Sequence, residues 1–257
     1  MTTKLSAAEV PGAQQDSDLA ALCAVLRPRR FAGARRLAGR IIHVLNYRQR
    51  QRRYDAFVLE RVRGVPVVCV PGVLNPKLMR SGDFFASHID SVDIASDWTV
   101  LDMGTGTGVG AVFAARRARR VIGVDINAAA VRCAMTNAWL NGVEQRVDMR
   151  HGDLFEPLVG ERFDLVLFNP PFVRGVPTSE LDRAWRSTDV AGRFAAGLQQ
   201  HLQPSGYALL LLSTYGDARW YLDALHVQNF RISVAATRDY YNERLIIFKV
   251  CPAVAQA

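Results

Sequence analysis

The chain contains an apolar run that ends in an acid and passes directly into a glycine-rich turn. Val100-Leu101-Asp102 is followed by Met-Gly-Thr-Gly-Thr-Gly-Val-Gly at residues 103–110. Glycine has no Cβ atom, so such a turn can bend tightly and let the backbone approach a ligand closely. A helix that starts in the turn favours an anionic or nucleotide ligand at its N-terminus. This feature predicts an α/β fold with a nucleoside-type ligand at the end of one strand.

Apolar segments of strand length alternate with segments of helical length after this turn. Strands are predicted at residues 99–103, 120–124, 146–150, 164–168, 207–213, 231–237 and 244–250, and helices at residues 109–118, 127–141, 190–202 and 217–228. Strands that stay apolar without alternation are typical of a parallel sheet covered on both faces. The short connection at residues 238–243 makes the last two strands a hairpin. We expect an α/β, Rossmann-like fold with a seven-stranded, mostly parallel sheet and an antiparallel C-terminal hairpin.

A block of arginines marks the N-terminal part of the chain. The formal net charge is +8, and residues 27–53 contain ten arginines and no acid. Such a block predicts an anionic partner, although it can also be a solubilising surface. Helices are expected over residues 18–26 and 31–54, after a loose tail at residues 1–16. The second helix can lie on a membrane, hold RNA or pack on the main domain, and the sequence leaves these alternatives open.

The segment between the arginine block and the glycine turn has its own pattern. Residues 65–73 are β-branched and interrupted by two prolines, which predicts an edge strand or a short hairpin. A loop at Asn75-Pro76 is followed by a helix that should begin near Ser81. Its inward-facing residues are expected to be Phe84, Phe85 and Ile89.

The cysteines and apolar runs bear on the compartment. The four cysteines are far apart and have no Cys/His ligand spacing, so neither a disulfide framework nor a metal site is expected. No apolar run approaches the roughly 18–20 residues that a membrane-spanning helix needs. We therefore expect a cytoplasmic protein without a transmembrane segment, and a peripheral position on a membrane stays open.

Two further acids follow predicted strands at the same edge of the sheet as the glycine turn. Asp125 comes nineteen residues after Gly106, where a carboxylate can bind the hydroxyls of a ribose. Asp153 follows the third strand and can accept a hydrogen bond from an adenine amino group. Gly106, Gly108 and Ala111 also satisfy the dinucleotide pattern GxGxxA, so an NAD(P)-dependent oxidoreductase remains an alternative. No Tyr/Lys pair that could serve it as proton donor follows the turn.

Asn169-Pro170-Pro171-Phe172 directly follows a buried apolar strand. Asn-Pro and Pro-Pro are common in ordinary loops, but beside a nucleoside site the chemistry becomes specific. The side-chain carbonyl of Asn169 and the main-chain carbonyl of Pro170 can each accept one N–H bond from an amide or aromatic amine. Held in this way, the nitrogen lone pair faces a reaction partner without a general base. The prolines stiffen the loop, and Phe172 offers a ring face to a planar group.

With these motifs the chain resembles the class I S-adenosylmethionine (SAM)-dependent methyltransferases that carry an Asn-Pro-Pro-Tyr/Phe motif. The likeness is greatest to the small methyltransferase domain of release-factor glutamine methylases and of rRNA and tRNA N-methylases. It covers about residues 75–250 and continues through Ala184-Trp185-Arg186, Gly192-Arg193 and the final hairpin. Residues 81–85 match the family's approach segment only loosely, and the first sixty residues have no counterpart. The methyl acceptor therefore does not carry over.

The resemblance implies a SAM-dependent N-methyltransferase whose acceptor is a protein amide, an RNA base or a small metabolite amine. The cofactor is then SAM, bound by Asp102, Gly104, Thr105, Gly106, Gly108, Asp125, Ile126, Asn127, Asp153, Leu154 and Asn169. The implied catalytic residues are Asn169, Pro170, Pro171 and Phe172, with Trp185 and Arg186 at the substrate and no metal. A SAM-fold subunit that has lost catalysis is a third alternative, against which the intact motif argues. The expected divisions are residues 1–63 (tail and basic helical extension), 64–97 (lead-in segment) and 98–257 (SAM-binding domain).

Overall fold

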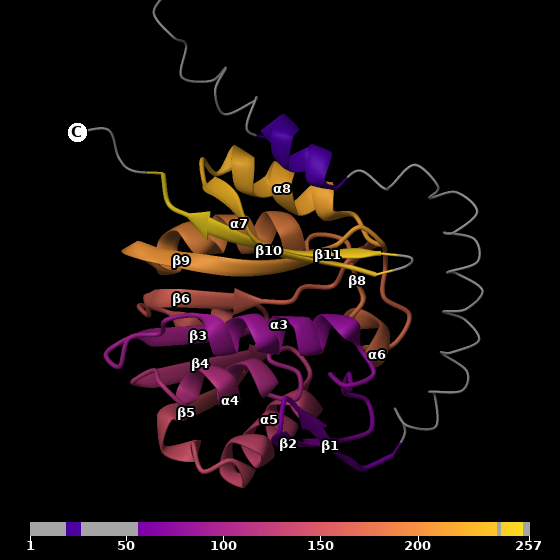
Figure 1. The fold of residues 1–257 in the computed structure, drawn as a ribbon, viewed down its shortest axis with the longest axis vertical. Coiled ribbons are helices and arrows are strands. Elements are labelled where there is room, and N and C mark those ends of the chain that lie inside the picture. The colour runs from indigo at the N-terminus through magenta and orange to yellow at the C-terminus, as the bar shows by residue number, and fades with distance from the viewer. Residues whose placement is uncertain (1–18, 27–55, 241–242, 254–257) are drawn as a thin grey trace, which may run out of the picture.

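The computed structural model describes residues 19–26, 56–240 and 243–253 of the chain. Its centre is a seven-stranded sheet with the strand order β10-β11-β9-β6-β3-β4-β5 (Figure 1). In chain order the strands are β3 (Thr99–Met103), β4 (Arg120–Asp125), β5 (Val147–His151), β6 (Phe163–Phe168), β9 (Leu202–Ser213), β10 (Arg231–Asp239) and β11 (Arg244–Cys251). Strands β5, β4, β3, β6 and β9 run parallel to one another, and β11 is antiparallel to both β9 and β10. The predicted fold class is confirmed.

The closing hairpin has its second strand inside the sheet and its first strand at the edge. β11 pairs with β9, and β10 forms only the outer neighbour of β11. The side chains of residues 245–248 (Leu-Ile-Ile-Phe) are buried, whereas those of β10 alternate between half-buried and exposed. A continuous apolar run fits a central strand that is covered on both faces, and a more polar strand fits the edge.

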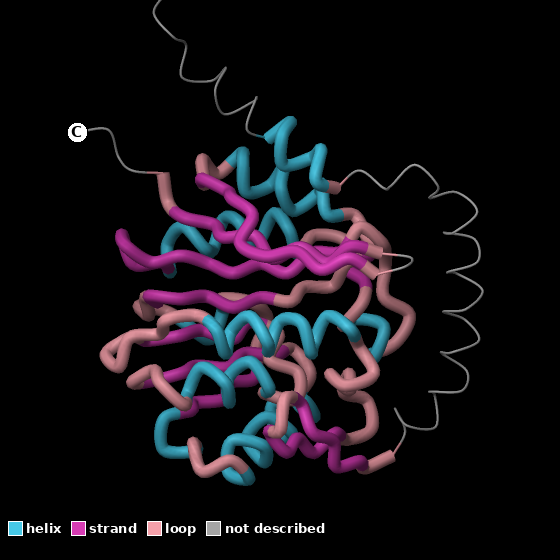
Figure 2. The backbone as a smooth tube through the Cα atoms, viewed as in Figure 1, coloured by secondary structure: helices cyan, strands magenta, loops and turns pink. Residues whose placement is uncertain are grey.

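Helices cover both faces of this sheet (Figure 2). Each face has its own apolar core. One face carries α3 (Arg80–Ser91), α4 (Val109–Ala115) and α5 (Ala128–Leu140). The other face carries α7 (Val190–His201) and α8 (Ala218–Val227). The predicted helices of the main domain are therefore confirmed. Short turns of helix lie at η1 (Glu144–Arg146), η2 (Glu156–Leu158) and α6 (Glu180–Arg183).

One predicted strand begins earlier than expected. β9 starts at Leu202, five residues before the predicted start, because Leu202 pairs with Phe163 ahead of an irregularity in the ladder. Pro204 and Gly206 hide this beginning in the sequence, since both residues usually interrupt strands.

The part of the chain before β3 adds two features to the main domain. Residues 19–25 are helical, as predicted, and Leu19 and Leu22 pack on the α7–α8 side of the sheet, beside α8 in Figure 1. Strands β1 (Val58–Val62) and β2 (Val65–Cys69) form a separate antiparallel hairpin, so the hairpin alternative is confirmed. The expected division between residues 63 and 64 falls in the turn of this hairpin. The helix predicted over residues 31–54 lies outside the described residues.

The lead-in helix is also confirmed. α3 begins at Arg80, next to the predicted Ser81, and buries Phe84, Phe85 and Ile89 against the sheet. None of the helices among the described residues is long and apolar enough to cross a membrane, and no metal-binding cluster of His, Cys, Asp or Glu is found in the same ranges.

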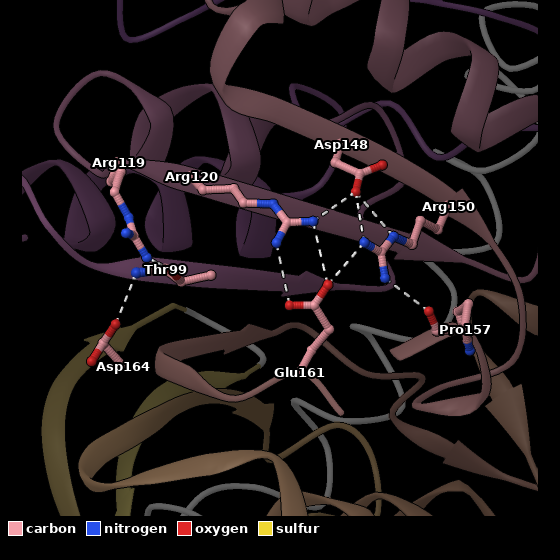
Figure 3. Close-up of polar contacts among 8 residues, drawn as sticks. All are labelled: Thr99, Arg119, Arg120, Asp148, Arg150, Pro157, Glu161 and Asp164. Atoms are coloured by element: carbon pink, nitrogen blue, oxygen red, sulfur yellow. Dashed lines mark hydrogen bonds and ion pairs between the residues drawn. The ribbon is translucent and has the colours of Figure 1, made fainter. Parts of the chain in front are cut away.

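A network of charged side chains joins β4, β5 and the segment before β6 (Figure 3). The guanidinium of Arg120 lies 3.2 Å from Glu161 and 3.1 Å from Asp148. Arg150 contacts the same two acids at 3.0 and 2.7 Å. Two arginines thus share two carboxylates, and this arrangement fixes the relative positions of three neighbouring segments.

Candidate active site

The glycine turn joins β3 to α4 and depends on backbone angles that glycine adopts without strain. Three glycines of the turn have positive φ: Gly104 (+62°), Gly106 (+57°) and Gly108 (+78°). A Cβ atom on Gly108 would lie 2.8 Å from Cα of Ala134 in α5, and one on Gly110 would lie 2.7 Å from a carboxylate oxygen of Asp102. A larger residue at either position would push neighbouring groups apart. The glycines therefore allow the turn to pack closely on α5 and on Asp102.

Asp102, at the carboxyl end of β3, holds this turn in place through hydrogen bonds. Its side chain is buried, and one carboxylate oxygen accepts hydrogen bonds from the Thr105 hydroxyl at 2.7 Å and from the Ala111 N–H at 2.8 Å. Burial raises the pKa of Asp102 to about 7, against the lowering effect of these two bonds. Neither Asp102 nor Gly108 lines the cavity described below. Both hold the shape of the turn, and direct contact with a ligand stays a prediction for them.

Asp125 fixes the tip of the same turn from the end of β4. One of its oxygens accepts a hydrogen bond from the Gly106 N–H at 2.8 Å, and the other accepts one from the Asn127 N–H at 2.9 Å. Burial raises the pKa of Asp125, and these bonds oppose the shift. Each carboxylate oxygen can accept a second hydrogen bond. The carboxylate can therefore still bind a ribose hydroxyl, while Ile126 beside it exposes 43% of its surface.

Asp153 lies in the tight turn that follows β5. A Cβ atom on Gly152 would meet the ring of Pro157 at 2.8 Å, and Leu154 has a φ of +50°, which is unusual for a residue with a side chain. One oxygen of Asp153 accepts a hydrogen bond of 2.8 Å from Arg193 at the start of α7. The turn and the arginine together determine where the Asp153 carboxylate points.

Two carbonyls of the Asn-Pro-Pro-Phe loop are already bound within the protein. The Pro171 carbonyl accepts a hydrogen bond of 2.9 Å from the hydroxyl of the fully buried Tyr221. The Phe172 carbonyl accepts one of 2.8 Å from the Asp217 N–H. Both donors come from the start of α8, so this helix holds the second half of the loop.

The first half of the loop has two acceptors that remain available. Oδ1 of Asn169 is buried and has no hydrogen-bond partner. The Pro170 carbonyl likewise receives no hydrogen bond from the residues that the structure describes. Met103, at the end of β3, pairs with Phe168, so Asn169 and Gly104 begin side by side at the same end of the sheet. The predicted juxtaposition of the two motifs is therefore present.

The segment that follows the loop returns beside it. Strand β7 (Val173–Arg174) pairs with β8 (Arg186–Ser187), and the Val173 N–H donates to the Trp185 carbonyl at 2.8 Å. The Arg186 guanidinium lies 3.1 Å from Asp182. These two-residue strands bring Trp185 and Arg186 to the wall of the cavity, although neither strand was predicted from the sequence.

A cavity of about 320 Å³ unites these elements. Its volume is in the range of small-molecule sites. The predicted site residues that line it are Gly104, Thr105, Gly106, Asp125, Ile126, Asn127, Asp153, Leu154, Asn169, Pro170, Pro171, Phe172, Trp185 and Arg186. Only 8% of the surface of Phe172 is exposed to solvent, so the residue offers little ring face to a planar group.

Three residues with a place in this geometry were not assigned to it from the sequence. Tyr221 and Asp217 resemble an ordinary core residue and an ordinary helix cap, since Asp217 also accepts from the Trp220 N–H. Arg193 was noted only as part of a resemblance, and its partner Asp153 is forty residues away in the chain. Only the arrangement in space reveals these roles.

A comparison with models of protein families matches residues 67–238 to the methyltransferase small domain. The chain belongs to this family. It is a SAM-dependent N-methyltransferase, and the dinucleotide-dependent oxidoreductase alternative is therefore wrong.

Curated relatives of this methyltransferase act on two kinds of acceptor, according to their names. A putative protein N5-glutamine methyltransferase of Methanocaldococcus jannaschii is 31% identical over 58% of the chain and 78% of its own length. A release factor glutamine methyltransferase of Xylella fastidiosa is 32% identical over 61% of the chain and 66% of its own length. The ribosomal RNA small subunit methyltransferase C of Alcanivorax borkumensis is 34% identical over 63% of the chain, which spans only 47% of that relative.

Solved structures share the fold of this methyltransferase. The 16S rRNA N2 G1207 methyltransferase of T. thermophilus, in complex with AdoMet and guanosine, has a TM-score of 0.58 at 20% identity and covers 77% of the chain and 50% of its own. The E. cuniculi Mtq2–Trm112 complex has a TM-score of 0.53 at 20% identity and covers 71% of the chain and 99% of its own.

The cavity of this methyltransferase fits SAM on its own geometry. The glycine turn is a cradle that a Cβ atom on Gly108 would disrupt, and Asp125 lines the same cavity as the turn. Two exposed or partly exposed apolar residues, Ile126 and Leu154, can contact a purine ring. Beyond them, the unpartnered Oδ1 of Asn169 marks a place for an N–H donor.

Proposed function

We propose that the chain transfers the methyl group of SAM to the side-chain amide nitrogen of a glutamine in a protein. The observation that carries this proposal is that Asn169 lines the same cavity as the glycine turn, while its buried Oδ1 has no hydrogen-bond partner. A buried acceptor without a partner costs free energy in the resting protein. A primary amide has two N–H groups, which match Oδ1 of Asn169 and the carbonyl of Pro170.

These two acceptors would prepare the amide nitrogen for reaction. The lone pair of an amide nitrogen is delocalised into its carbonyl group, so the nitrogen is a weak nucleophile. Two hydrogen bonds to Asn169 and Pro170 hold the plane of the amide and direct the lone pair toward the methyl group. Positive charge that develops on the nitrogen is stabilised by the two carbonyl oxygens. SAM supplies the electrophilic methyl group when it is bound, and the methylated nitrogen afterwards releases one proton to solvent.

The cofactor would bind along the glycine turn. Asp125 receives the ribose hydroxyls, and Ile126 and Leu154 contact the adenine, whose amino group lies at Asp153. The backbone of Gly104 and Gly106 then approaches the remainder of the cofactor without steric hindrance. Positioning of both reactants in one cavity can contribute several kcal/mol to the rate enhancement.

Two observations favour a glutamine acceptor. The two relatives described above as glutamine methyltransferases are matched over 78% and 66% of their length, against 47% for the rRNA methyltransferase. Phe172 is buried, so the cavity supplies less stacking surface than a flipped-out base would use. A base in RNA is the second candidate, because residues 27–53 contain ten arginines.

Transfer of a labelled methyl group into a cell extract tests the proposal. The purified protein is incubated with the extract and SAM carrying a tritiated methyl group, and protein, RNA and small molecules are then separated. We expect label in protein, and acid hydrolysis should release it as methylamine, because hydrolysis of an N-methylated amide frees the amine. Label that enters RNA and stays on a base would instead support the second candidate.

The same assay needs a control for adventitious activity. Asn169→Ala should incorporate no label above background under identical conditions. Arg219→Gln, on the exposed side of α8, should incorporate as much label as the natural protein.

A further inference from the structure

Arg193 meets three acidic side chains at the rim of the cavity. Its guanidinium lies 2.8 Å from Asp153, 3.5 Å from Asp189 and 3.8 Å from Glu156. The three acids come from different segments: the turn after β5, the N-cap of α7 and the start of η2. Arg193, Asp153 and Asp189 all line the cavity. The side chain of Arg193 therefore connects the wall of the cavity that is expected to bind the cofactor with the segment that bears Trp185.

Only the contact with Asp153 has the geometry of a short hydrogen bond. It joins Nη2 of Arg193 to Oδ2 of Asp153, while the other two distances are 3.5 Å or more. This bond is also the largest influence that raises the pKa of Arg193. Oδ1 of Asp153 accepts no hydrogen bond from the described residues. One oxygen of Asp153 is thus occupied by the protein, and the other is available to a ligand.

The main chain around Asp153 is fixed, but it does not fix the orientation of the carboxylate, which depends on Arg193. Leu154 has a positive φ, and Gly152 packs against Pro157, so the main chain of the turn is closely determined. The side chain of Asp153, by contrast, has 32% of its surface exposed, and its carboxylate can rotate. An ionised carboxylate only accepts hydrogen bonds. Its orientation decides whether it can recognise an N–H group in the cavity.

We propose that Arg193 is a positioning residue, which holds the Asp153 carboxylate so that its free oxygen selects a 6-amino purine over a 6-oxo purine. The inference rests on the proposed placement of the SAM adenine at Asp153. An adenine amino group donates to the held oxygen. A 6-oxo purine has a carbonyl oxygen at that position. This partially negative oxygen is repelled by the negative carboxylate oxygen. Arg193 acts through Asp153 and needs no contact with the cofactor.

Affinity for two nucleosides separates this role from an ordinary surface ion pair. Exposed ion pairs contribute little to stability, so the unfolding midpoint of an Arg193 variant should hardly change. Selectivity is a different quantity, because it depends only on where the Asp153 oxygen points. It is measured as the ratio of the dissociation constants of S-inosylhomocysteine and S-adenosylhomocysteine, both by titration calorimetry.

The experiment uses the full chain with Arg193→Gln, Asp153→Asn, the double variant and Arg219→Gln as matched control. Both arginines have an acidic partner four residues along a helix: Asp189 for Arg193 and Asp223 for Arg219. Arg193 and Asp189 line the cavity, and Arg219 and Asp223 do not. We expect the natural protein and Arg219→Gln to prefer S-adenosylhomocysteine by about 10- to 100-fold, the range of a charge-assisted hydrogen bond. In Arg193→Gln and Asp153→Asn the preference should fall to within a few-fold, and the double variant should lose nothing further.

Two outcomes would overturn the inference. An unchanged preference in Arg193→Gln would mean that Asp153 is oriented without Arg193. A further loss of preference when Arg193→Gln is added to Asp153→Asn would mean that Arg193 contacts the purine itself. Both results are independent of the proposed glutamine acceptor, because they are obtained without any methyl acceptor. Failure of the acceptor assay would in turn leave the measured preference unaffected.

Discussion

The hydroxyl of Tyr221 donates a hydrogen bond of 2.9 Å to the carbonyl of Pro171, from a side chain with no exposed surface. The bond joins α8 on one face of the sheet to the loop that follows β6. It also occupies one of the two lone pairs of the Pro171 carbonyl. Oδ1 of Asn169 and the carbonyl of Pro170 are the acceptors of the loop that receive no hydrogen bond from the described residues.

Tyr221→Phe should slow methyl transfer without weakening cofactor binding. Loss of the hydroxyl leaves the Pro171 carbonyl unsatisfied, which costs about 1–3 kcal/mol and lets the loop shift. We expect kcat to fall roughly tenfold or more, with the dissociation constant of S-adenosylhomocysteine within a few-fold of the natural value. Tyr207→Phe, at a half-buried tyrosine of β9 outside the cavity, is the matched control. A loss of stability with unchanged kcat would make Tyr221 a core residue only.

Asn169→Ala should abolish activity and leave the fold as stable as before. Oδ1 of Asn169 forms no hydrogen bond in the protein, so its removal relieves a buried unsatisfied group. We expect at least a hundredfold loss of kcat, together with an unfolding midpoint that is unchanged or higher. Affinity for S-adenosylhomocysteine should stay within a few-fold.

Asn141→Ala gives the opposite pattern and serves as the control for Asn169. The Asn141 amide donates to the carbonyls of Pro66 and Asn137, at 2.9 and 2.8 Å, far from the loop in the chain. Its loss should lower the unfolding midpoint and leave kcat nearly intact. Equal loss of stability in both variants would indicate that Asn169 is mainly structural.

Local sequence patterns predicted the elements that depend on neighbours in the chain. The glycine turn, the acid at the end of β4 and the uniformly apolar strands each express a local requirement, and each is found where it was expected. The pairings of β11 and β8 depend on contacts across long stretches of chain. β11 is placed between β9 and β10 by its burial on both faces, and β8 is too short to show any periodicity.

The residues of the candidate site also divide into those that a local motif predicts and those that only contacts in space reveal. Asn169 and Asp125 were identified because the chemistry of each is visible in its own short motif. Tyr221 lies on the apolar face of α8, and nothing in the sequence distinguishes a buried hydroxyl that binds a loop from one that fills a core. The arginine beside Asp153 could be found only from the distance between them.

Asp102 should make stability fall as the pH rises from about 4 to 8. Its pKa is raised to about 7 by burial, so the folded protein binds a proton that the unfolded chain releases near pH 4. The contribution is fully present below the unfolded pKa and is lost as the pH rises through about 7. Asp102→Asn can keep both hydrogen bonds, because its Oδ1 can accept from the Thr105 hydroxyl and the Ala111 N–H in place of the one carboxylate oxygen. In urea denaturation at pH 5 and pH 8, its stability should differ less than that of the natural protein, by up to roughly 3 kcal/mol. An identical pH dependence in both proteins would contradict the shift.

Asp148 should act in the opposite direction, at the acid end of the pH range. Burial alone would raise its pKa, but hydrogen bonds from Arg150 and Arg120 lower it below the usual value. The stabilisation is therefore present above the unfolded pKa of about 4 and is lost as the pH falls through the lower folded value. Because 42% of the Asp148 side chain is exposed, Asp148→Asn should cost about 1 kcal/mol or less at pH 7. The difference should shrink at pH 3 and in 1 M salt, where the charges are neutralised or screened. A deficit that persists under both conditions would mean that packing of the side chain, and not its charge, joins β4 to β5.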